Sequence, residues 1–561
     1  MTEFSAPHHT ALAQLTGPGA PFEVTSYEID GITVKGFKQV ARSVVEILAP
    51  GRTFGDKLFL QYLDDRYTFT EFFQAADRLS VALQSQCGIK KGDRVAIAMR
   101  NCPEWVIAFV AIINVGATAV PLNSWGKTDE LHQGLSDSEA SLVICDKERH
   151  QFIRAAQASL PAIVVHPDPL DHASHAFWPL IATVDPSDWT TADIDPEDPA
   201  ILLFTSGTSG KPKGALFSHF NCCQALMNIE LIGAATYMTN TETMNQQLAN
   251  TTPPKTLLAV PLFHISGLFS QFVMNLRHGR GIYMMYKWSA DEAVKQVQQE
   301  KITVLMGASA MLLDLLQHPD FEQIDASVIT NVSAGGGATP EKLHSLYRTK
   351  LSAAMPGAGW GLTETGGSGA AFTGHMAAQR PGASGFPSPI VDFKFCDDQG
   401  QALPPGQPGE IWIKSAACIT RYFSGAHDNS DFHEGWFKTG DVGYLNEDGL
   451  LYICDRVKDM IIRGGENIYP IEIENCLLQF PGCAEVVVVA IESERFGEEP
   501  AAVIRLNDNA QPVTAEQIQA FCAERLAGFK VPVEVRFANE PMPRTATEKL
   551  IKADIKRAFF G

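Results

Sequence analysis

Residues 201–214 read ILLFTSGTSGKPKG, an apolar run that enters a loop of glycines, hydroxyls and lysines. A short apolar run bounded by turn residues is typical of a buried strand. In the loop, the glycines leave the backbone free to point its N–H groups at one spot. Hydroxyl and lysine side chains add donors and positive charge there. The stretch predicts a strand that leads into a phosphate-binding loop.

Two familiar phosphate-loop patterns do not fit this stretch. In a Walker loop, the second glycine stands five positions after the first and a lysine follows it. Five positions after Gly207, this sequence has Pro212 instead of glycine. The dinucleotide pattern G-x-G-x-x-G does not follow the apolar run either. The loop therefore belongs to a different class of phosphate site. Its candidate binding residues are Thr205, Ser206, Gly207, Thr208, Ser209, Gly210 and Lys213.

Similar apolar runs on both sides of this loop predict the fold class. VAIAM at 95, SLVIC at 141, AIVVH at 162, TLLAV at 256, TVLM at 303 and SVITNVS at 327 alternate with helical patterns. Such alternation is typical of an α/β fold, in which helices cover parallel sheets.

The pattern of residue types changes toward the C-terminus. Near residue 380 short strands and Gly/Pro-rich turns predict a small antiparallel or β-barrel-like subdomain, with a hairpin at Asp448-Gly449. After Asp455 the charged segment DRVKD precedes a compact pattern of helices and strands. We expect a hinge there, between a large body over 1–455 and a small mobile α+β domain over 456–561.

The bulk composition excludes several classes of protein. The chain has 561 residues, 45% of them apolar and 19% charged, as in ordinary globular proteins with more than one subdomain. The formal charge of −20 argues against nucleic acid as a partner and permits a local basic pocket for a small polyanion.

Cysteine usage and hydropathy predict a cytoplasmic location. The 11 cysteines are scattered and form no C-x-x-C pair, and the N-terminal sequence shows no secretory signal. The longest apolar run, 105–122, contains Asn114, Gly116 and Pro121, and favours a buried helix leading into a strand over a transmembrane segment. Oligomeric state and peripheral membrane contact stay open.

Three further motifs concentrate reactive side chains in loops. GWGLTET at 359–365 combines an aromatic ring, a hydroxyl and a carboxylate; GWFKTGD at 435–441 ends on an aspartate; PRTATEKLIK at 543–552 places a lysine in the tail. Each motif alone also has an ordinary explanation as a turn, a packed aromatic residue or a solvated lysine.

Taken together and in this order, the motifs resemble the adenylate-forming superfamily, which includes acyl-CoA synthetases, aryl-CoA ligases, adenylation domains of peptide synthetases and firefly luciferase. The resemblance extends from about residue 40 to the end. It implies that 204–214 closes over the β and γ phosphates of ATP. The implied reaction converts a carboxylate and ATP into acyl-AMP and pyrophosphate, and a thiol then releases AMP.

The resemblance also implies roles for individual residues. Lys549 would bridge the substrate carboxylate and the α-phosphate, Glu364 would hold Mg²⁺, and Thr363 would lie on the phosphate side. Trp360 and Gly361 would lie against the adenine, beside the glycine-rich loop 333–340, a turn that we also expect Thr339 to cap before a helix. The remaining implied nucleotide contacts are Asp441 and Arg456 on the ribose and Gly335, Gly336 and Gly337 along the adenine and acyl site.

A second group of implied roles concerns the acyl group and coenzyme A. His264 would lie at the mouth of the acyl pocket, although a lone histidine beside apolar residues is also commonly packed. Lys458 would be the pivot of a domain rotation between the half-reactions. That rotation would withdraw Lys549 and bring Gly464 and Gly465 to the tunnel for coenzyme A.

The leading interpretation is an ATP-dependent acyl-CoA ligase. The alternatives are a stand-alone enzyme that loads an acyl carrier protein, luciferase-like oxygenation, and a catalytically silent nucleotide-binding homologue. Small residues at 366–369 favour a hydrophobic monocarboxylic acid, a medium or long fatty acid first and an aromatic or cyclic acid second. Glu548 stands where the family usually has glycine, and we expect a modest effect on adenylation.

Overall fold

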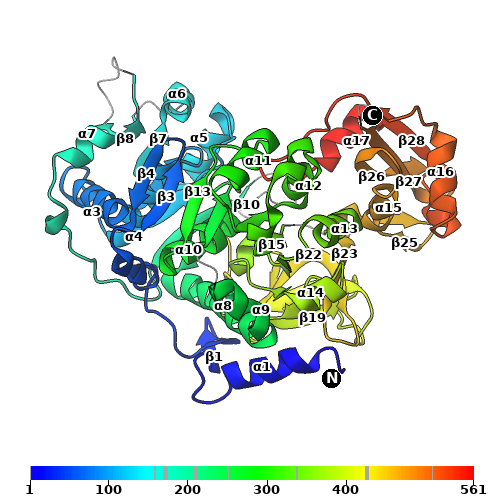
Figure 1. Cartoon of the computed structure of the whole chain (residues 1–561), viewed down its shortest axis with the longest axis horizontal. Helices are drawn as coiled ribbons and strands as arrows, with labels where there is room; N and C mark the ends of the chain where they lie inside the picture. The colour runs from blue at the N-terminus through cyan, green and yellow to red at the C-terminus, as the bar shows by residue number, and fades with distance from the viewer. Residues whose placement is uncertain are drawn as a thin grey trace.

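The computed structural model describes residues 2–156, 159–168, 175–205, 212–249, 252–336, 339–423, 429–507 and 510–561. Two large sheets with flanking helices form the body, and a smaller unit, orange to red in Figure 1, carries the C-terminus. Within the described ranges, no helix is both long and apolar enough to cross a bilayer.

The first sheet has seven strands and contains most of the apolar runs found in the N-terminal half. Five of the six neighbouring pairs are parallel, and only the first strand of the order is antiparallel to its partner. Its strands, in spatial order, are β11 (Lys213–Ser218), β10 (Pro199–Thr205), β6 (Thr118–Pro121), β5 (Arg94–Ala98), β7 (Leu142–Asp146), β8 (Ala162–Val165) and β9 (His175–Ala176). The predicted strand before the glycine loop is therefore β10.

The second sheet has nine strands and joins distant parts of the chain. Its central strands are parallel, and its ends are antiparallel. Its spatial order is β18 (Phe386–Pro387), β17 (Ala370–Thr373), β16 (Met355–Trp360), β15 (Asn331–Ala334), β14 (Val304–Gly307), β12 (Lys255–Leu258), β13 (Gly281–Met284), β3 (Leu58–Tyr62) and β4 (Asp65–Thr68).

Helices flank these sheets, and several begin at predictable caps. Thr68 and Glu71 form a capping box at one helix, and Ser218 and Asn221 form another, satisfying backbone N–H groups that have no partner inside the helix. The helices of the body are α2 (Val44–Leu48), α3 (Phe69–Ser85), α4 (Pro103–Asn114), α5 (Thr128–Ser138), α6 (Lys147–Ala156), α7 (Phe177–Ala182), α8 (His219–Thr239), α9 (Thr241–Ala249), α10 (Met274–Arg277), α11 (Ala290–Gln299), α12 (Ser309–Gln317), α13 (Glu341–Lys350) and α14 (His375–Gln379).

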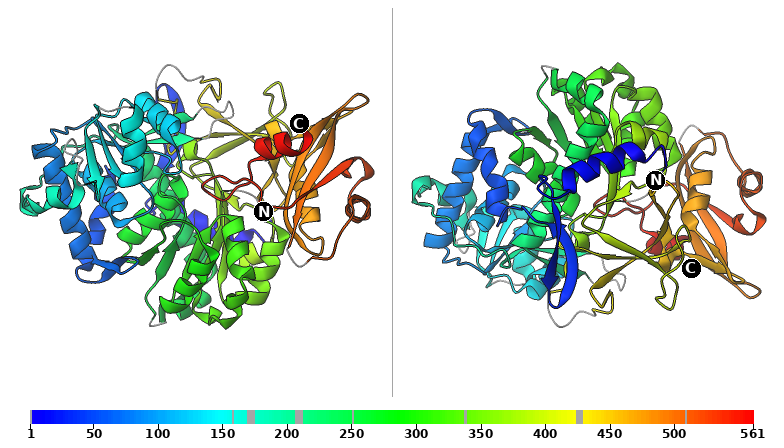
Figure 2. Two further views of the ribbon diagram at one scale, coloured as in Figure 1. Left: turned by 90° about the horizontal axis from the view of Figure 1, so that it is seen from above. Right: turned by 90° about the horizontal axis from the view of Figure 1, so that it is seen from below.

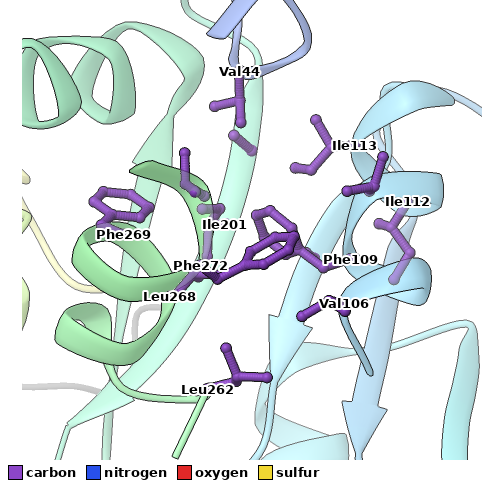
Figure 3. Packing of buried hydrophobic residues seen from close by; sticks show 14 of the residues in the cluster. Val44, Val106, Phe109, Ile112, Ile113, Ile201, Leu262, Leu268, Phe269 and Phe272 are labelled. Carbon is purple, nitrogen blue, oxygen red and sulfur yellow. The ribbon is translucent and has the colours of Figure 1, made fainter. Parts of the chain in front are cut away.

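The main hydrophobic core lies where the two sheets face each other through helices. Phe109 of α4 meets Phe272 of the π-helix Ser266–Val273 edge to face, with ring centroids 6.1 Å apart. Figure 3 shows both rings between the two helices, with Ile201 of β10 close by. The predicted helix-to-strand segment 105–122 is confirmed as α4 followed by β6, both fully buried.

A third sheet corresponds to the predicted small antiparallel subdomain. It contains β19 (Asp392–Cys396), β20 (Gly409–Lys414), β21 (Phe432–His433), β22 (Trp436–Leu445) and β23 (Leu451–Arg456). The turn at Asp448-Gly449 joins β22 to β23 as predicted, and Gly449 has a φ of 81°. The pairing places Asp441 directly opposite Arg456.

The C-terminal unit has its own sheet and core. Its strands are β24 (Ile461–Arg463), β25 (Glu466–Ile468), β26 (Cys483–Ser493), β27 (Gly497–Leu506) and β28 (Glu534–Ala538), with helices α15 (Pro470–Leu477), α16 (Ala515–Ala523) and α17 (Lys552–Phe560). Buried side chains of these elements pack into clusters separate from the core of the body. The position of the boundary between the two units stays a prediction.

An additional helix and hairpin precede the body. Helix α1 (Ala6–Thr16) lies along α8, and β1 (Val24–Ile29) pairs with β2 (Ile32–Phe37). The view from below in Figure 2 shows α1 crossing the body on the face that carries α8. The sequence patterns used above did not predict this helix.

Two local predictions were wrong. The run at 327 begins as a 3₁₀ turn, Ala326–Val328, and the strand starts only at Asn331. The helix after the glycine-rich loop begins at Glu341, with Pro340 at its N-cap and no side-chain cap. Thr339 therefore stands one residue too early to cap it, because an N-cap side chain must reach the N–H groups of the first turn.

Candidate functional site

The tail lysine lies on a tight hairpin. The backbone N–H of Thr545 donates to the carbonyl of Lys549 at 2.8 Å, and Lys549 N–H donates back to Thr545 Oγ1 at 3.2 Å. Glu548, next to it, has a φ of 62°, a left-handed conformation that glycine adopts without strain. This geometry gives a physical reason why glycine is usual at that position.

An ion-pair cluster fixes the hairpin to the C-terminal sheet. Arg544 donates to Glu485 Oε1 at 2.6 Å and to the carbonyl of Glu548 at 2.7 Å, and Arg505 donates to Glu485 Oε2 at 3.0 Å. Burial favours the neutral form of Glu485, but these bonds and one from the Met542 N–H outweigh burial and lower its pKa. Glu485 is thus an ionised anchor beneath the hairpin.

The ammonium group of Lys549 reaches back into the body. A Cβ built on Gly336 would lie 3.5 Å from Lys549 Nζ, so the lysine passes directly over this glycine, whose φ is 80°. The residue as a whole is exposed, and its ammonium group lies beside Gly336 of the body. Desolvation lowers the pKa of Lys549, Arg456 lowers it further, and Asp441 opposes both.

His264 lies at the other side of the same cleft. It precedes the π-helix Ser266–Val273, and its ring is 4.3 Å from that of Phe263. Desolvation and the nearby charge of Lys549 lower the pKa of His264 to about 4. His264 is therefore neutral near pH 7 and offers no charge to compete with that of the lysine.

Trp360, which is half-buried, and the ion pair of Asp441 with Arg456 lie near Lys549. The indole N–H of Trp360, at the end of β16, donates to Asp441 Oδ2 at 2.8 Å. Arg456 Nε lies 3.2 Å from Asp441 Oδ1. Asp441 itself is only 7% exposed, so its two oxygens are held in a fixed orientation beside a flat aromatic surface.

Glu364 lies in a polar pocket at the next turn. Its Oε1 accepts a 2.9 Å hydrogen bond from Tyr422. Burial raises the pKa of Glu364, and the negative charge of Asp431 adds to that rise. Thr205, at the end of β10, lies near enough to lower the pKa, yet its buried Oγ1 forms no hydrogen bond of good geometry with any described residue.

Lys213 is placed differently from a free phosphate ligand. Its Nζ is 2.6 Å from Asp431 Oδ2 and 4.8 Å from the centre of the Tyr422 ring, and the side chain is nearly buried. Lys213 pairs across the strands with Thr205. In this structure the lysine therefore stabilises the base of the loop, and the predicted phosphate contact stays a prediction.

The other predicted residues fall into three places. Thr363 is in the short 3₁₀ turn that carries Glu364, and Gly361 packs against the carbonyl of Gly367. Gly335 follows β15 beside the lysine cleft. Lys458, Gly464 and Gly465 are instead exposed: the first is in the turn Val457–Asp459 and the two glycines join β24 to β25. Ser206, Gly207, Thr208, Ser209, Gly210 and Gly337 lie outside the described residues.

Three residues that the sequence analysis missed complete the site. Tyr422 and Asp431 connect Glu364 to Lys213, and Arg544 anchors the lysine hairpin. Tyr422 and Asp431 belong to a region where the sequence shows only turn signals, so no pattern marked them. The basic residue within the tail motif was visible, but its partner Glu485 was not.

The assembled cleft has the chemistry of a nucleotide site. It combines a cationic side chain, a fixed carboxylate beside an indole, a buried carboxylate and the buried hydroxyl of Thr205 at the end of β10. Within the described part of the chain, no three His, Cys, Asp or Glu side chains gather into a metal site.

Comparisons with known proteins show which family the chain resembles. Residues 49–423 match the AMP-binding enzyme family, and residues 472–549 match the AMP-binding enzyme C-terminal domain. The chain is 30% identical to a feruloyl-CoA synthase of Amycolatopsis sp, over 88% of this chain and 94% of that protein. It is 31% identical to the long-chain-fatty-acid–CoA ligase FadD13 of Mycobacterium tuberculosis, with the same coverage.

A solved structure extends the likeness to three dimensions. The o-succinylbenzoate coenzyme A synthetase of Bacillus subtilis, in complex with ATP and a magnesium ion, superposes with a TM-score of 0.74. The two sequences are 28% identical, over 92% of this chain and 100% of that one.

Proposed function

The chain belongs to the AMP-binding enzyme family, and from this premise we propose that it is an AMP-forming acid-thiol ligase that converts a hydrophobic carboxylic acid into its coenzyme A thioester. The observation that carries the proposal is the position of Lys549, above Gly336 and beside Asp441 and Arg456. A carboxylate and the α-phosphate of ATP are both anions, and a cation between them favours their approach.

Each wall of the cleft has a distinct task in the first half-reaction. Asp441 would accept hydrogen bonds from the ribose hydroxyls, since an ionised carboxylate has only acceptors. Trp360 would cover the adenine and at the same time orient Asp441 through its N–H. Thr205 Oγ1, buried beside Glu364, would donate to a phosphate oxygen.

The buried carboxylate fits a magnesium ion. Burial and the negative charge of Asp431 both destabilise the ionised form of Glu364 and so raise its pKa. A divalent cation beside the carboxylate would offset this destabilisation. Mg²⁺ commonly takes one or two carboxylates and completes its shell with phosphate oxygens and water. When bound, the ion would offset the negative charge that develops on the leaving pyrophosphate.

The second half-reaction requires the lysine hairpin to leave. We propose a boundary between residues 455 and 456, with Lys458 as the pivot, so that the C-terminal unit turns and brings Gly464 and Gly465 toward the thiol path. Both glycines have positive φ values, 60° and 92°, and lie in an exposed turn, where a thiol arm could pass close to the backbone. The separate core of the C-terminal unit supports movement as a rigid body.

The acid is proposed to be a medium or long fatty acid first and an aromatic or cyclic acid second. Relatives named for a long-chain fatty acid and for ferulate support both classes. A cytoplasmic location is part of the proposal, because the 11 cysteines are scattered and form no C-x-x-C pair.

The test is pyrophosphate exchange and thioester formation with ATP, Mg²⁺ and a panel of fatty, aromatic and cyclic acids, with coenzyme A or a carrier protein as the thiol. We expect acid-dependent exchange that Lys549→Met lowers by at least about 100-fold, as is usual when a group that stabilises transition-state charge is removed. The matched control Lys556→Met, an exposed lysine on α17, should retain full exchange. Exchange that is indifferent to Lys549 would refute the assigned role, and a preference for the carrier protein would replace coenzyme A as the acceptor.

A further inference from the structure

A cavity lies behind the glycine-rich turn that follows Glu364. Its empty space of about 570 Å³ includes open solvent at its mouth, so the enclosed part is smaller. Its walls come from α1, from α8 and from β17 and β18. We call it the α1 cavity.

The α1 cavity borders the proposed active site through glycine alone. Gly367 and Gly369 both line it. On the other side, a Cβ on Gly369 would lie 2.7 Å from the Trp360 ring, and a Cβ on Gly367 would lie 3.7 Å from Ile265, the neighbour of His264. Neither of these two positions therefore places a side chain between the cavity and Trp360 or Ile265.

The lining suits an uncharged, apolar ligand. Helix α8 contributes Leu231, Ile232 and Ala235, and its two lining threonines, Thr236 and Thr239, donate their hydroxyls to backbone carbonyls within the helix at 2.7 and 2.9 Å. Among the residues that the structure describes, no Asp, Glu, Lys or Arg lines the cavity. Hydrocarbon is the ligand chemistry that such a surface favours.

Helix α1 closes the far side with His8 and Leu12. His8 stacks on Phe386 with ring centroids 4.0 Å apart, and desolvation lowers its pKa to about 4, so it faces the cavity side uncharged near pH 7. The start of the helix is held independently, because Phe4 lies under the Arg380 guanidinium at 3.9 Å and Thr2 donates to Asp448. Helix α1 precedes residue 49, where the family match begins.

We infer that the α1 cavity receives the distal hydrocarbon end of the acyl group and that α1, through Leu12 and His8, is the outer wall that limits its length. This inference rests on the proposed function for the identity of the ligand, but not for the existence of the site. A bulkier side chain at Leu12 should shorten the space, and a smaller one should lengthen it.

The test uses binding and turnover separately. Fluorescent cis-parinaric acid is titrated into the full-length protein and into Leu12→Trp, with Gln14→Trp as the matched control, since Gln14 is exposed on the same helix. We expect affinity to fall at least 10-fold in Leu12→Trp and to stay unchanged in the control, a size comparable to the roughly 10-fold effect of one methylene in an apolar pocket. Thr236→Trp fills the cavity from α8 and should weaken binding equally, which excludes simple undocking of α1.

The rate of thioester formation then shows which length of acyl chain each variant prefers. In thioester formation with saturated acids from butanoic to hexadecanoic, Leu12→Trp should move the best substrate to a shorter acid and Leu12→Ala to a longer one. Unchanged binding and an unchanged chain-length profile in both tryptophan variants would overturn the inference and leave the ligase intact. Leu12-dependent binding without any thioester formation would refute the proposed function and retain the site.

Discussion

The indole N–H of Trp360 donates a 2.8 Å hydrogen bond to Asp441 Oδ2, across 81 positions of the chain. This bond joins the last residue of β16 to the middle of β22, and so couples the nine-stranded sheet of the body to the antiparallel sheet that follows it. The aromatic surface and the carboxylate assigned to the nucleoside are thus one unit.

Trp360→Phe keeps an aromatic surface but removes this donor. We expect KM for ATP to rise by at least about 10-fold, because a hydrogen bond to a charged group contributes about 1.5–3 kcal/mol and about 1.4 kcal/mol is a factor of ten. Steady-state kinetics with varied ATP measure the change. Trp412→Phe is the control, since its indole donates to Glu410 at 2.9 Å within β20; an equal rise in both variants would contradict the assignment.

Arg544 anchors the hairpin that carries Lys549, the lysine that we propose to act in adenylation. Arg544→Met removes the bonds to Glu485 and to the Glu548 carbonyl, so the hairpin loses its anchor. Pyrophosphate exchange should fall at least about 10-fold, since small displacements of a positioned group are costly. Conversion of supplied acyl-AMP by coenzyme A should change little.

Two further variants serve as controls for the Arg544→Met experiment. Arg544→Lys keeps a cation near Glu485 and should recover part of the exchange rate. Arg557→Met, an exposed arginine of α17 whose side chain lies 3.3 Å from Asp554, should match the wild type in both half-reactions. A parallel loss of both half-reactions in Arg544→Met would indicate general damage to the fold.

Glu548 allows a backbone prediction. Its φ of 62° costs a residue with a Cβ roughly 1–2 kcal/mol, which glycine avoids. Glu548→Gly should therefore be more stable than Glu548→Ala by about 1 kcal/mol in urea unfolding. The Glu548 carboxylate lies 4.0 Å from Arg544 Nε, toward Asp314 and Glu485, so the effect of Glu548→Gly on adenylation should be modest. A less stable glycine variant, or an unchanged exchange rate, would contradict these expectations.

His219 predicts how stability depends on pH. It is fully buried, its Nδ1 accepts from the Val44 N–H at 3.1 Å, and desolvation lowers its pKa from 6.5 to about 4. The folded state therefore binds a proton less tightly than the unfolded state. Stability should be lost as the pH falls from about 6.5 toward 4, by up to roughly 3 kcal/mol for this group.

His219→Asn tests this sign, because an asparagine oxygen can accept from Val44 without titrating. Urea unfolding at several pH values should show a shallower acid loss in the variant than in the wild type. His8 and His264, whose pKa values are also lowered to about 4, will keep part of the slope. A steeper slope in the variant would reverse the argument.

The strands and the motif residues could be predicted from the sequence for one physical reason. Buried parallel strands are continuous apolar runs, and reactive loops at their ends carry glycine and polar residues, so VAIAM at 95 and ILLF at 201 were recognisable. Glu364, Trp360, Asp441 and Lys549 were visible as motif members, and the structure brings them to one cleft.

Long-range partners were invisible for an equally physical reason. Tyr422 donates to Glu364 across 58 positions, and nothing in either local pattern encodes that encounter. Helix α1 has buried contacts but weak amphipathic periodicity, so its sequence predicts no packed helix. The late start of β15 reflects local 3₁₀ bonding that outcompetes strand propensity.

The pairing of β3 with β13 has a consequence for biosynthesis. Leu60 leaves the ribosome early, but its partner Ile282 follows more than two hundred residues later. The seven-stranded sheet between them, residues 94–218, can close first, whereas β3 must stay without its parallel neighbour until the chain has grown that far. The early strand is thus the segment of the nascent chain that most needs protection from wrong partners.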